Sequence, residues 1–305
     1  MKKCLICSNE FNPFVDFGSM PIANAFSTKK ELENEYFFPM QVGFCETCKM
    51  VQLLEQPDRE KMFHDSYAFF SSTSNYMINH FKKFANSVSS LQNLSKKSFV
   101  VEIGSNDGIM LQNFVSDNIP CLGVEPSKNV AHVAMERGIE VTTEFFDRPL
   151  AEKISKTHQK ADAILSANVM CHIPYMHSIF EGVKALLKND GVFIFEDPYL
   201  GEIIEKTSFD QIYDEHVFLF SALSVSHIVK KHDLELINVE PQITHGGSMR
   251  YTIAHNGVKK VSENVLSLIG KEKQMRLDKK EAYMDFTDNV NKIKKDLIEL
   301  LTKLK

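Results

Sequence analysis

From Phe99 onward the sequence alternates short apolar segments with segments of helical spacing. The apolar segments are typical of strands buried on both faces, and they read FVVEI, CLGVE, IEV, ADAILSAN and GVFIFE. The segments between them repeat apolar residues at helical intervals. Such repeated strand–helix units predict an open, doubly wound α/β sheet with helices on both faces. Ligands of such sheets bind at the carboxyl ends of the strands, so functional residues should follow strand ends.

The first strand ends in EIGSNDG, residues 102–108. Gly104 allows a sharp turn, and Gly108 admits close approach of the following helix. The spacing differs from G-x-G-x-x-G, and Asp107 would repel a pyrophosphate placed there. About 20 residues later the second strand ends in Glu125, where a carboxylate can accept hydrogen bonds from ribose hydroxyls. These features predict a nucleoside ligand and favour S-adenosylmethionine over NAD. The alternatives are an NAD enzyme of the same topology, or a Glu125 that is merely an acid at a helix start.

The fourth and fifth strands also end in polar residues. SANVMCHIP places Asn168 and His172 at one strand end, and FEDPYLG adds Glu196 and Asp197 at the next. We expect these side chains to lie over the same cleft. A histidine in this position can serve structure or catalysis, and the sequence leaves both open.

The segment KTSFDQIYDEHVFLFS, residues 206–221, leaves the fifth strand and holds Tyr213, Glu215 and His216 close together. S-adenosylmethionine already carries an electrophilic methyl group, so the protein need supply only position and a base matched to the acceptor. An amine acceptor needs little base, a hydroxyl needs a base or a metal, and a carbon acceptor needs an acidic C–H beside a carbonyl with donors to hold the enolate. His216 could be the base and Tyr213 a donor to the enolate oxygen, with Glu215 orienting an imidazole. The alternative is a capping and salt-bridge cluster on a connecting loop.

Two C-x-x-C pairs lie near the N-terminus, Cys4 with Cys7 and Cys45 with Cys48. Four thiolates at this spacing suit tetrahedral Zn²⁺ and leave no open coordination position, so we expect a structural zinc ion. The alternatives are four unrelated buried cysteines or a redox pair, which needs only one motif in a βαβ context. The ion would hold together a lobe that is marginal on its own.

Composition excludes several classes of protein. The net charge of −5 and the lack of a basic stripe around the cysteines argue against nucleic acid as a partner. The chain has no run of about 18 apolar residues, so we expect no membrane span. The N-terminus lacks the apolar core of a signal peptide. We therefore expect a cytoplasmic protein. Its oligomeric state cannot be read from the sequence.

The chain resembles the zinc-containing sugar C-methyltransferases of deoxysugar biosynthesis, which methylate carbon 3 of nucleotide-linked 4-keto-6-deoxysugars. The matching pieces occur in order from Cys4 to about Ile253: CLIC, CETC, SYAFFSSTS, EIGSNDG, NVMCHIP, FEDPYLGEIIEKTSFDQIYDEHVFLFS and HGGSMRYTI. The resemblance implies a class I S-adenosylmethionine methyltransferase fold, Rossmann-like, with an N-terminal zinc lobe and a nucleotide-sugar substrate. Rival functions are O- or N-methylation of another small metabolite, and a non-catalytic zinc and nucleoside-binding module.

The resemblance also implies site residues. His216 would be the general base, and the other catalytic residues would be Tyr213, Glu215, His172 and Tyr67. The residues expected to bind the cofactor are Glu102, Gly104, Asn106, Gly108, Glu125, Phe145 and Asn168. His245 and Arg250 would contact the substrate.

We expect three parts in the chain: a zinc-binding lobe over residues 1–75, a methyltransferase domain over 76–256 and a helical tail over 257–305. The tail carries an apolar stripe at helical spacing, formed by Phe286, Val290, Ile293, Leu297, Leu300 and Leu304. Members of the family continue into a second Rossmann-like domain. We expect that C-terminal domain to be missing from this chain.

Overall fold

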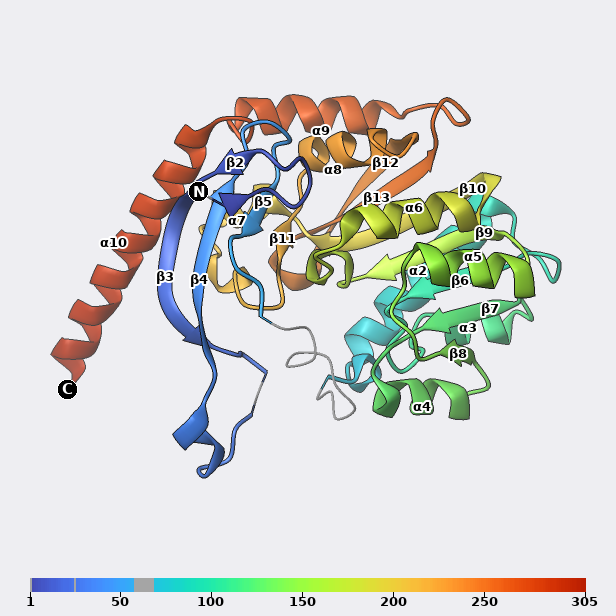
Figure 1. Ribbon diagram of the computed structural model, residues 1–305, viewed down its shortest axis with the longest axis horizontal. Helices are drawn as coiled ribbons and strands as arrows, with labels where there is room; N and C mark the ends of the chain where they lie inside the picture. The colour runs from blue at the N-terminus through green and yellow to red at the C-terminus, as the bar shows by residue number, and fades with distance from the viewer. Residues whose placement is uncertain (1, 25, 58–68) are drawn as a thin grey trace.

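The computed structural model describes residues 2–24, 26–57 and 69–305 (Figure 1). Its centre is a seven-stranded sheet of order β12-β13-β10-β9-β6-β7-β8. The strands are β6 (Val100–Ile103), β7 (Cys121–Val124), β8 (Glu140–Thr142), β9 (Ala161–Ala167), β10 (Leu187–Pro198), β12 (Leu234–Gln242) and β13 (Ser248–His255). The five strands from β6 to β10 are parallel, as predicted. β13 pairs antiparallel with both β10 and β12, so the sheet is mixed.

Helices cover both faces of this sheet because successive strand residues point to opposite sides. Val100 belongs to a core cluster with residues of α2, α3 and α4 on one face, and Val101 belongs to a cluster with residues of α5, α6, α8 and α9 on the other. These helices are α2 (Asn75–Gln92), α3 (Leu111–Ser116), α4 (Lys128–Glu136), α5 (Arg148–Thr157), α6 (Met176–Leu186), α8 (Ala222–Lys230) and α9 (Glu263–Gln274). The doubly wound architecture predicted from the sequence is confirmed.

The N-terminal lobe has a four-stranded sheet of its own, of order β11-β5-β4-β3. Three strands come from the N-terminal region, β3 (Pro13–Pro21), β4 (Phe37–Phe44) and β5 (Val51–Leu53). The edge strand β11 (Phe218–Leu219) comes from the middle of the chain and pairs antiparallel with β5. A small ribbon of β1 (Lys2–Lys3) and β2 (Glu10–Phe11) flanks the first cysteine pair. Sequence patterns predicted neither this sheet nor the contribution of β11.

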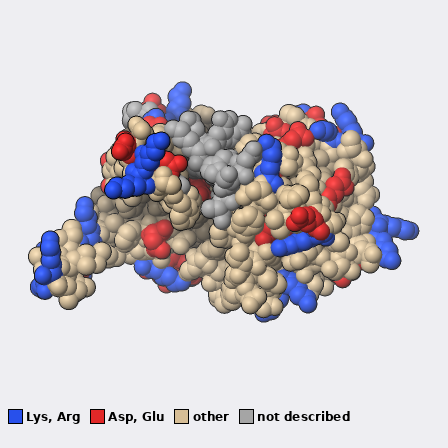
Figure 2. All heavy atoms as spheres, turned by 90° about the horizontal axis from the view of Figure 1, so that it is seen from below, with Lys and Arg blue, Asp and Glu red and all other residues tan. Residues whose placement is uncertain are grey.

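The long C-terminal helix α10 (Lys280–Leu304) confirms the predicted amphipathic helix. Its first half packs on the lobe, where Tyr283 and Phe286 are buried against β3, β4 and α7 (Leu200–Lys206). From Ile293 to Leu304 the apolar residues are exposed, and this end of the helix projects from the molecule (Figures 1 and 2). On the face shown in Figure 2 acidic and basic side chains are interspersed.

Short helical turns complete the chain: η1 (Glu31–Asn34), η2 (Ser71–Thr73), η3 (Met170–His172), η4 (Phe209–Gln211) and η5 (Thr244–Gly246). Within the described ranges, no helix combines the length and the apolar character needed to cross a bilayer.

Candidate active site

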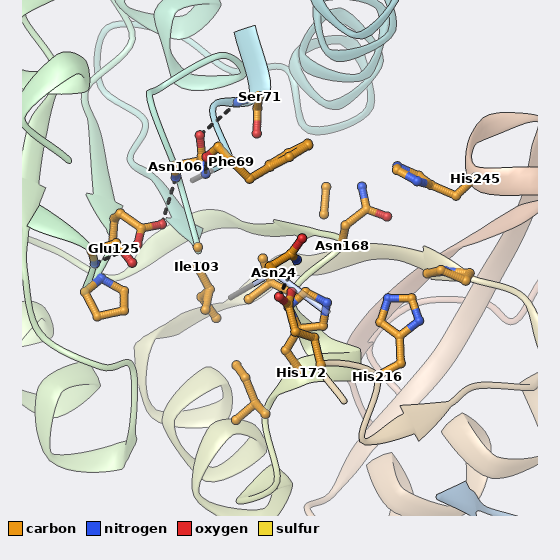
Figure 3. A pocket seen from close by; sticks show the side chains of 18 of the residues that line it. Asn24, Phe69, Ser71, Ile103, Asn106, Glu125, Asn168, His172, His216 and His245 are labelled. Atoms are coloured by element: carbon orange, nitrogen blue, oxygen red, sulfur yellow. Dashed lines mark hydrogen bonds between the residues drawn. The ribbon is translucent and has the colours of Figure 1, made fainter. Parts of the chain in front are cut away.

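A cavity of about 610 Å³ opens at the carboxyl ends of the parallel strands (Figure 3). Ile103 ends β6, Ala167 ends β9 and Pro198 ends β10, and all three line the cavity. This is the position at which doubly wound sheets bind ligands. The lobe also contributes to the wall through Ala23 and Asn24, which sequence reasoning missed because no motif marks them.

The turn after β6 has the strained backbone that its sequence predicts. Gly104 has φ +70°, and a Cβ there would lie 2.8 Å from Val169 Cγ1. Asn106, with φ +48°, follows in the same left-handed region. Position 104 therefore requires glycine both for its backbone conformation and for lack of space, whereas position 106 holds an asparagine.

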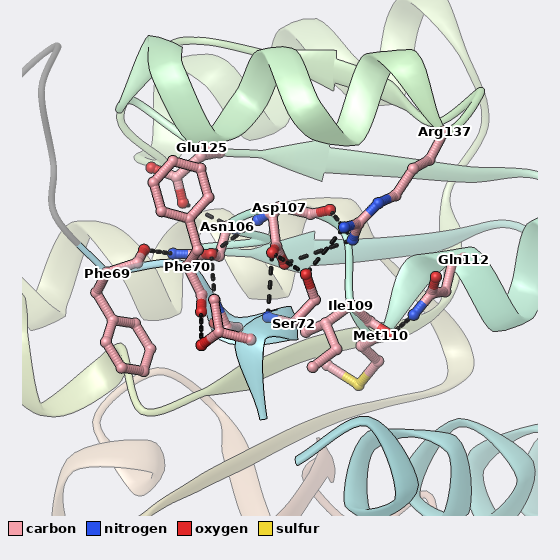
Figure 4. A network of polar contacts seen from close by, with 12 residues as sticks. Phe69, Phe70, Ser72, Asn106, Asp107, Ile109, Met110, Gln112, Glu125 and Arg137 are labelled. Carbon is pink, nitrogen blue, oxygen red and sulfur yellow. Dashed lines mark hydrogen bonds and ion pairs between the residues drawn. The ribbon is translucent and has the colours of Figure 1, made fainter. Parts of the chain in front are cut away.

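The turn is tied to the segment 69–73 by a polar network (Figure 4). Asn106 Oδ1 accepts a hydrogen bond from Ser71 N at 3.0 Å, and Asn106 Nδ2 donates to Phe69 O at 3.0 Å. The neighbouring carboxylate of Asp107 accepts from both the N–H and the hydroxyl of Ser72. Phe69 is thereby held at the cavity wall with its ring 54% exposed. The SYAFFSSTS segment contains Phe69, but no pattern in the sequence marks this residue as part of the site.

Arg137 closes this network from the opposite side. Its Nη1 donates to Asp107 O at 2.7 Å and its Nη2 donates to Ser72 Oγ at 2.9 Å. Asp107 is fully buried and faces this arginine and Ser72, and it does not line the cavity. Asp107 therefore stabilises the turn from the side away from the cavity.

Two residues at strand ends give the cavity polar groups suited to S-adenosylmethionine. Glu125 is buried, and its carboxylate accepts from Asn106 N at 3.0 Å and from Ser127 N at 2.8 Å. Burial raises the pKa of Glu125, whereas these two bonds lower it. Among the described residues, Asn168 Oδ1 is a buried acceptor without a hydrogen-bond partner, and Asn168 lines the cavity. Such an acceptor suits an amino group of a ligand.

The charges of the lining also suit a cationic sulfonium. The described lining residues include Glu125, Asp210 and Glu215 but neither lysine nor arginine. Phe145 also lines the cavity. Glu102 and Gly108 do not line the cavity: Glu102 is buried within β6, and a Cβ on Gly108 would meet Ala134 of α4 at 3.1 Å. The structure thus places these two residues in the packing behind the site.

His216 lies across the cavity from the glycine turn, and one hydrogen bond fixes its protonation pattern. Its Nδ1 lies 2.7 Å from the backbone carbonyl oxygen of Gln211 in η4. A carbonyl only accepts, so Nδ1 carries the proton and the neutral ring has its lone pair on Nε2. Burial lowers the pKa of His216 to about 4, which keeps the ring neutral near pH 7. The arrangement gives a base and needs no help from Glu215 in setting the tautomer.

Tyr213 and His172 flank this imidazole. The Tyr213 ring lies 4.2 Å from that of His216, and the His172 ring 5.3 Å from it, between centroids. His245 lines the cavity as well, and burial lowers the pKa of both His172 and His245. Three neutral imidazoles and a phenol therefore gather at one end of the cavity, as Figure 3 shows for the histidines.

Arg250 does not line the cavity. Its Nε and Nη2 both donate to Glu196 Oε2, at 3.1 and 2.8 Å. Its Cζ lies 3.6 Å from the centre of the Phe84 ring. His80 holds the other oxygen of Glu196 at 2.7 Å. Arg250 is thus committed to a buried ion pair behind the site. Tyr67 lies outside the described residues.

The four cysteines of the lobe form one cluster whose sulfur atoms lie within 4.8 Å of one another. Cys4 Sγ lies 3.5 Å from Cys48 Sγ, and Cys7 Sγ lies 3.4 Å from Cys45 Sγ. Each pair is followed by a residue in the left-handed region, Ser8 and Lys49, both with φ +61°. Four converging sulfur atoms fit a tetrahedral zinc ion and leave no position for a substrate.

Fold and site together define a class I S-adenosylmethionine-dependent methyltransferase. The family model described as "Methyltransferase domain" matches residues 76–239, more than half of the chain, and the chain belongs to that family. A model described as "Putative zinc binding domain" matches residues 4–63, which include all four clustered cysteines. The protein is an enzyme with S-adenosylmethionine as cofactor and a zinc-binding lobe.

A third family model, "C-methyltransferase C-terminal domain", matches residues 243–305. The expectation that this domain is missing is therefore wrong. The last strand β13 and the helices α9 and α10 belong to the matched region, so what the sequence presented as a tail is a recognised part of the family's architecture.

Relatives agree with this assignment. The chain is 29% identical over 302 residues to C-methyltransferase NovU of Streptomyces niveus, with 98% of this chain and 72% of the relative covered. Together with the C-terminal family match, this supports S-adenosylmethionine-dependent C-methylation.

Solved structures show a weaker likeness. An S-adenosylmethionine-dependent methyltransferase from Clostridium acetobutylicum ATCC 824 has a TM-score of 0.45 at 12% identity, covering 61% of this chain and 94% of that one. Magnesium protoporphyrin IX methyltransferase from Synechocystis PCC 6803 has a TM-score of 0.46 at 11% identity, covering 59% of this chain and 83% of that one.

Proposed function

We propose that the protein methylates the carbon next to the ketone of a nucleotide-linked 4-keto-6-deoxysugar, with His216 as general base. The observation that carries the proposal is the hydrogen bond from His216 Nδ1 to Gln211 O, which leaves the lone pair on Nε2 of a ring that lines the cavity together with Tyr213. A base and a phenol side by side suit enolisation of a ketone. The identity of the sugar substrate is inferred from the family resemblance.

The residues would act in a defined order. His216 Nε2 removes the proton from the carbon beside the ketone, and the C–H electron pair forms the enolate. The Tyr213 hydroxyl donates to the developing enolate oxygen. When bound, S-adenosylmethionine supplies an electrophilic methyl group on sulfur. Glu125 and Asn168 would hold its nucleoside and amino groups, and the cavity walls would limit access of water to the reacting carbon. The imidazolium of His216 then returns its proton to solvent.

His172 and Glu215 would line the acceptor half of the cavity, and His245 would contact the sugar. The zinc ion would be structural. We place the domain boundaries of this enzyme near residues 75 and 256.

Solvent exchange tests the proposal separately from methyl transfer. The wild-type protein, incubated in D₂O with S-adenosylhomocysteine and a nucleotide-linked 4-keto-6-deoxysugar, should exchange the proton beside the ketone. His216→Gln should lose the exchange and still bind S-adenosylhomocysteine in calorimetry. A His216→Gln protein that exchanges at the wild-type rate would refute the assignment of the base. Methyl transfer by the wild type without any exchange would instead indicate an oxygen or nitrogen acceptor.

A further inference from the structure

The segment that carries Tyr213 and His216 is built into the sheet of the zinc-binding lobe. β11 begins two residues after His216 and pairs with β5, with Phe218 opposite Gln52. Leu53 N also donates to Val217 O at 2.9 Å, directly beside His216. The backbone of the candidate base is therefore anchored by the lobe on its C-terminal side.

The lobe also holds the segment through its side chains. Ala23 N donates to Asp214 Oδ1 at 3.0 Å, and Asn24 Nδ2 donates to Glu215 Oε1 at 2.6 Å. Asp214 and Glu215 are both buried residues, and both contacts join residues 191 positions apart in the sequence. Asn24 and Glu215 both line the cavity.

These contacts bear on the charge of Glu215. Burial raises its pKa, the bond from Asn24 lowers it, and the charge of Asp214 raises it again. The other titratable residues that line the same cavity are Glu125, His172, Asp210, Tyr213, His216 and His245. None of them supplies Glu215 with a positive charge at neutral pH, since the three histidines have lowered pKa values. The Asn24 amide is therefore the group that favours an ionised Glu215.

The zinc cluster connects to the same strand. Gln52 is buried in β5, and its Oε1 accepts from Leu5 N at 3.1 Å and lies 3.3 Å from Cys4 Sγ. Gln52 is also the register partner of Phe218. Cysteine knuckle, β5, β11 and His216 thus form one continuous set of contacts.

We propose that the zinc-binding lobe is a working part of the active site, in which Asn24 is a positioning residue that orients Glu215 toward the acceptor. The identity of the acceptor that Glu215 faces rests on the proposed function. The contact between Asn24 and Glu215 is observed independently of it. It gives the lobe a role in catalysis in addition to its role in stability.

Three variants test the inference. Asn24→Ala removes the donor, Asn24→Asp replaces the donor with a like charge of the same shape, and Asn34→Ala is the control, on the exposed turn η1 of the same lobe. We expect the turnover rate kcat to fall about tenfold in Asn24→Ala and further in Asn24→Asp. Asn34→Ala should match the wild type. Affinity for S-adenosylhomocysteine should stay within about twofold of the wild type in all three.

The pH dependence separates positioning from a general structural role. The acid limb of the kcat profile should move to higher pH in Asn24→Ala and further in Asn24→Asp, because the pKa of Glu215 rises in that order. A lobe loosened by the substitution would lower kcat without that ordered shift. Wild-type kcat and profile in both variants would overturn the inference, and so would a loss of activity that tracks a loss of S-adenosylhomocysteine binding.

One readout needs no substrate. With ¹³C-labelled glutamate, the Glu215 carboxyl resonance is assigned by its absence in Glu215→Gln and titrated in the wild type and both variants. Its pKa should rise in the order wild type, Asn24→Ala, Asn24→Asp, and equal values would overturn the inference. Failure of the wild type to exchange the sugar proton would count against the proposed function alone.

Discussion

The imidazole of His216 and the backbone carbonyl of Gln211, five positions apart in the sequence, are joined by a hydrogen bond of 2.7 Å. A backbone acceptor cannot be protonated or change its charge, so the tautomer of His216 stays fixed across the working pH range. The basic nitrogen is set by the fold of η4 and not by a carboxylate partner. This differs from our expectation that Glu215 orients the imidazole.

Acidification should destabilise the protein in part through this histidine. An unfolded histidine has a pKa near 6.5, whereas burial lowers that of folded His216 to about 4. The unfolded state therefore binds more protons below pH 6.5, and stability is lost as the pH falls from about 6.5 to about 4. Urea unfolding should show that the unfolding free energy falls between pH 7 and pH 4.5 in both proteins. The fall should be about 2–3 kcal/mol smaller in His216→Gln than in the wild type. Equal declines would mean that His216 is protonated in the folded state.

Gly104→Ala should weaken cofactor binding beyond the effect of backbone strain alone. The new Cβ would have to fit at φ +70° and also displace Val169. Gly138→Ala is the matched control, since Gly138 has φ +79° with nothing within 4 Å of a new Cβ. Both variants should lose about 1–2 kcal/mol of unfolding free energy from backbone strain. Only Gly104→Ala should also weaken S-adenosylhomocysteine binding, by about tenfold or more in calorimetry. Equal affinities would show that Val169 yields without disturbing the turn.

Ser72→Ala should loosen the segment that carries Phe69. The substitution removes one hydrogen bond to Asp107 and the acceptor of Arg137 Nη2, and leaves the Ser72 N–H bond in place. Loss of such bonds to charged groups costs about 1.5–3 kcal/mol, so S-adenosylhomocysteine affinity should fall about tenfold. Thr73→Ala is the control, because its hydroxyl donates only to Phe70 O within the described contacts. If both variants bind alike, the network does not hold the cavity wall.

Zinc analysis should find one ion per chain. Cys48→Ser removes a fully buried ligand, so it should abolish stoichiometric zinc and lower the melting temperature by several degrees. Cys121→Ser lies outside the cluster and should keep the full zinc content in atomic emission measurements. Stoichiometric zinc in Cys48→Ser would show that three sulfur atoms suffice.

The sequence was informative where local pattern and function coincide. Most of the parallel strands could be predicted because they are short apolar runs, and the polar residues Glu125 and Asn168 follow two of them. The cysteine cluster could be predicted because ligand spacing is local. Contacts made by Asn24 and Gln211 could not, since one depends on a partner 191 residues away and the other on a backbone atom. Arg250 was expected at the substrate from the family resemblance, whereas its pairing with the buried Glu196 follows from the register of β10 with β13, which the sequence does not show.

The pairing of β5 with β11 also bears on how the chain is made. Gln52 leaves the ribosome more than 160 residues before Phe218, so the lobe sheet has an open edge until most of the methyltransferase domain has been synthesised. At about 5–20 residues per second this interval lasts roughly 8–30 s. An unpaired β5 edge is a site for wrong pairing, and early capture of zinc by the cysteine pairs would limit it. Zinc supply during expression should therefore determine how much of the newly made protein folds rather than aggregates.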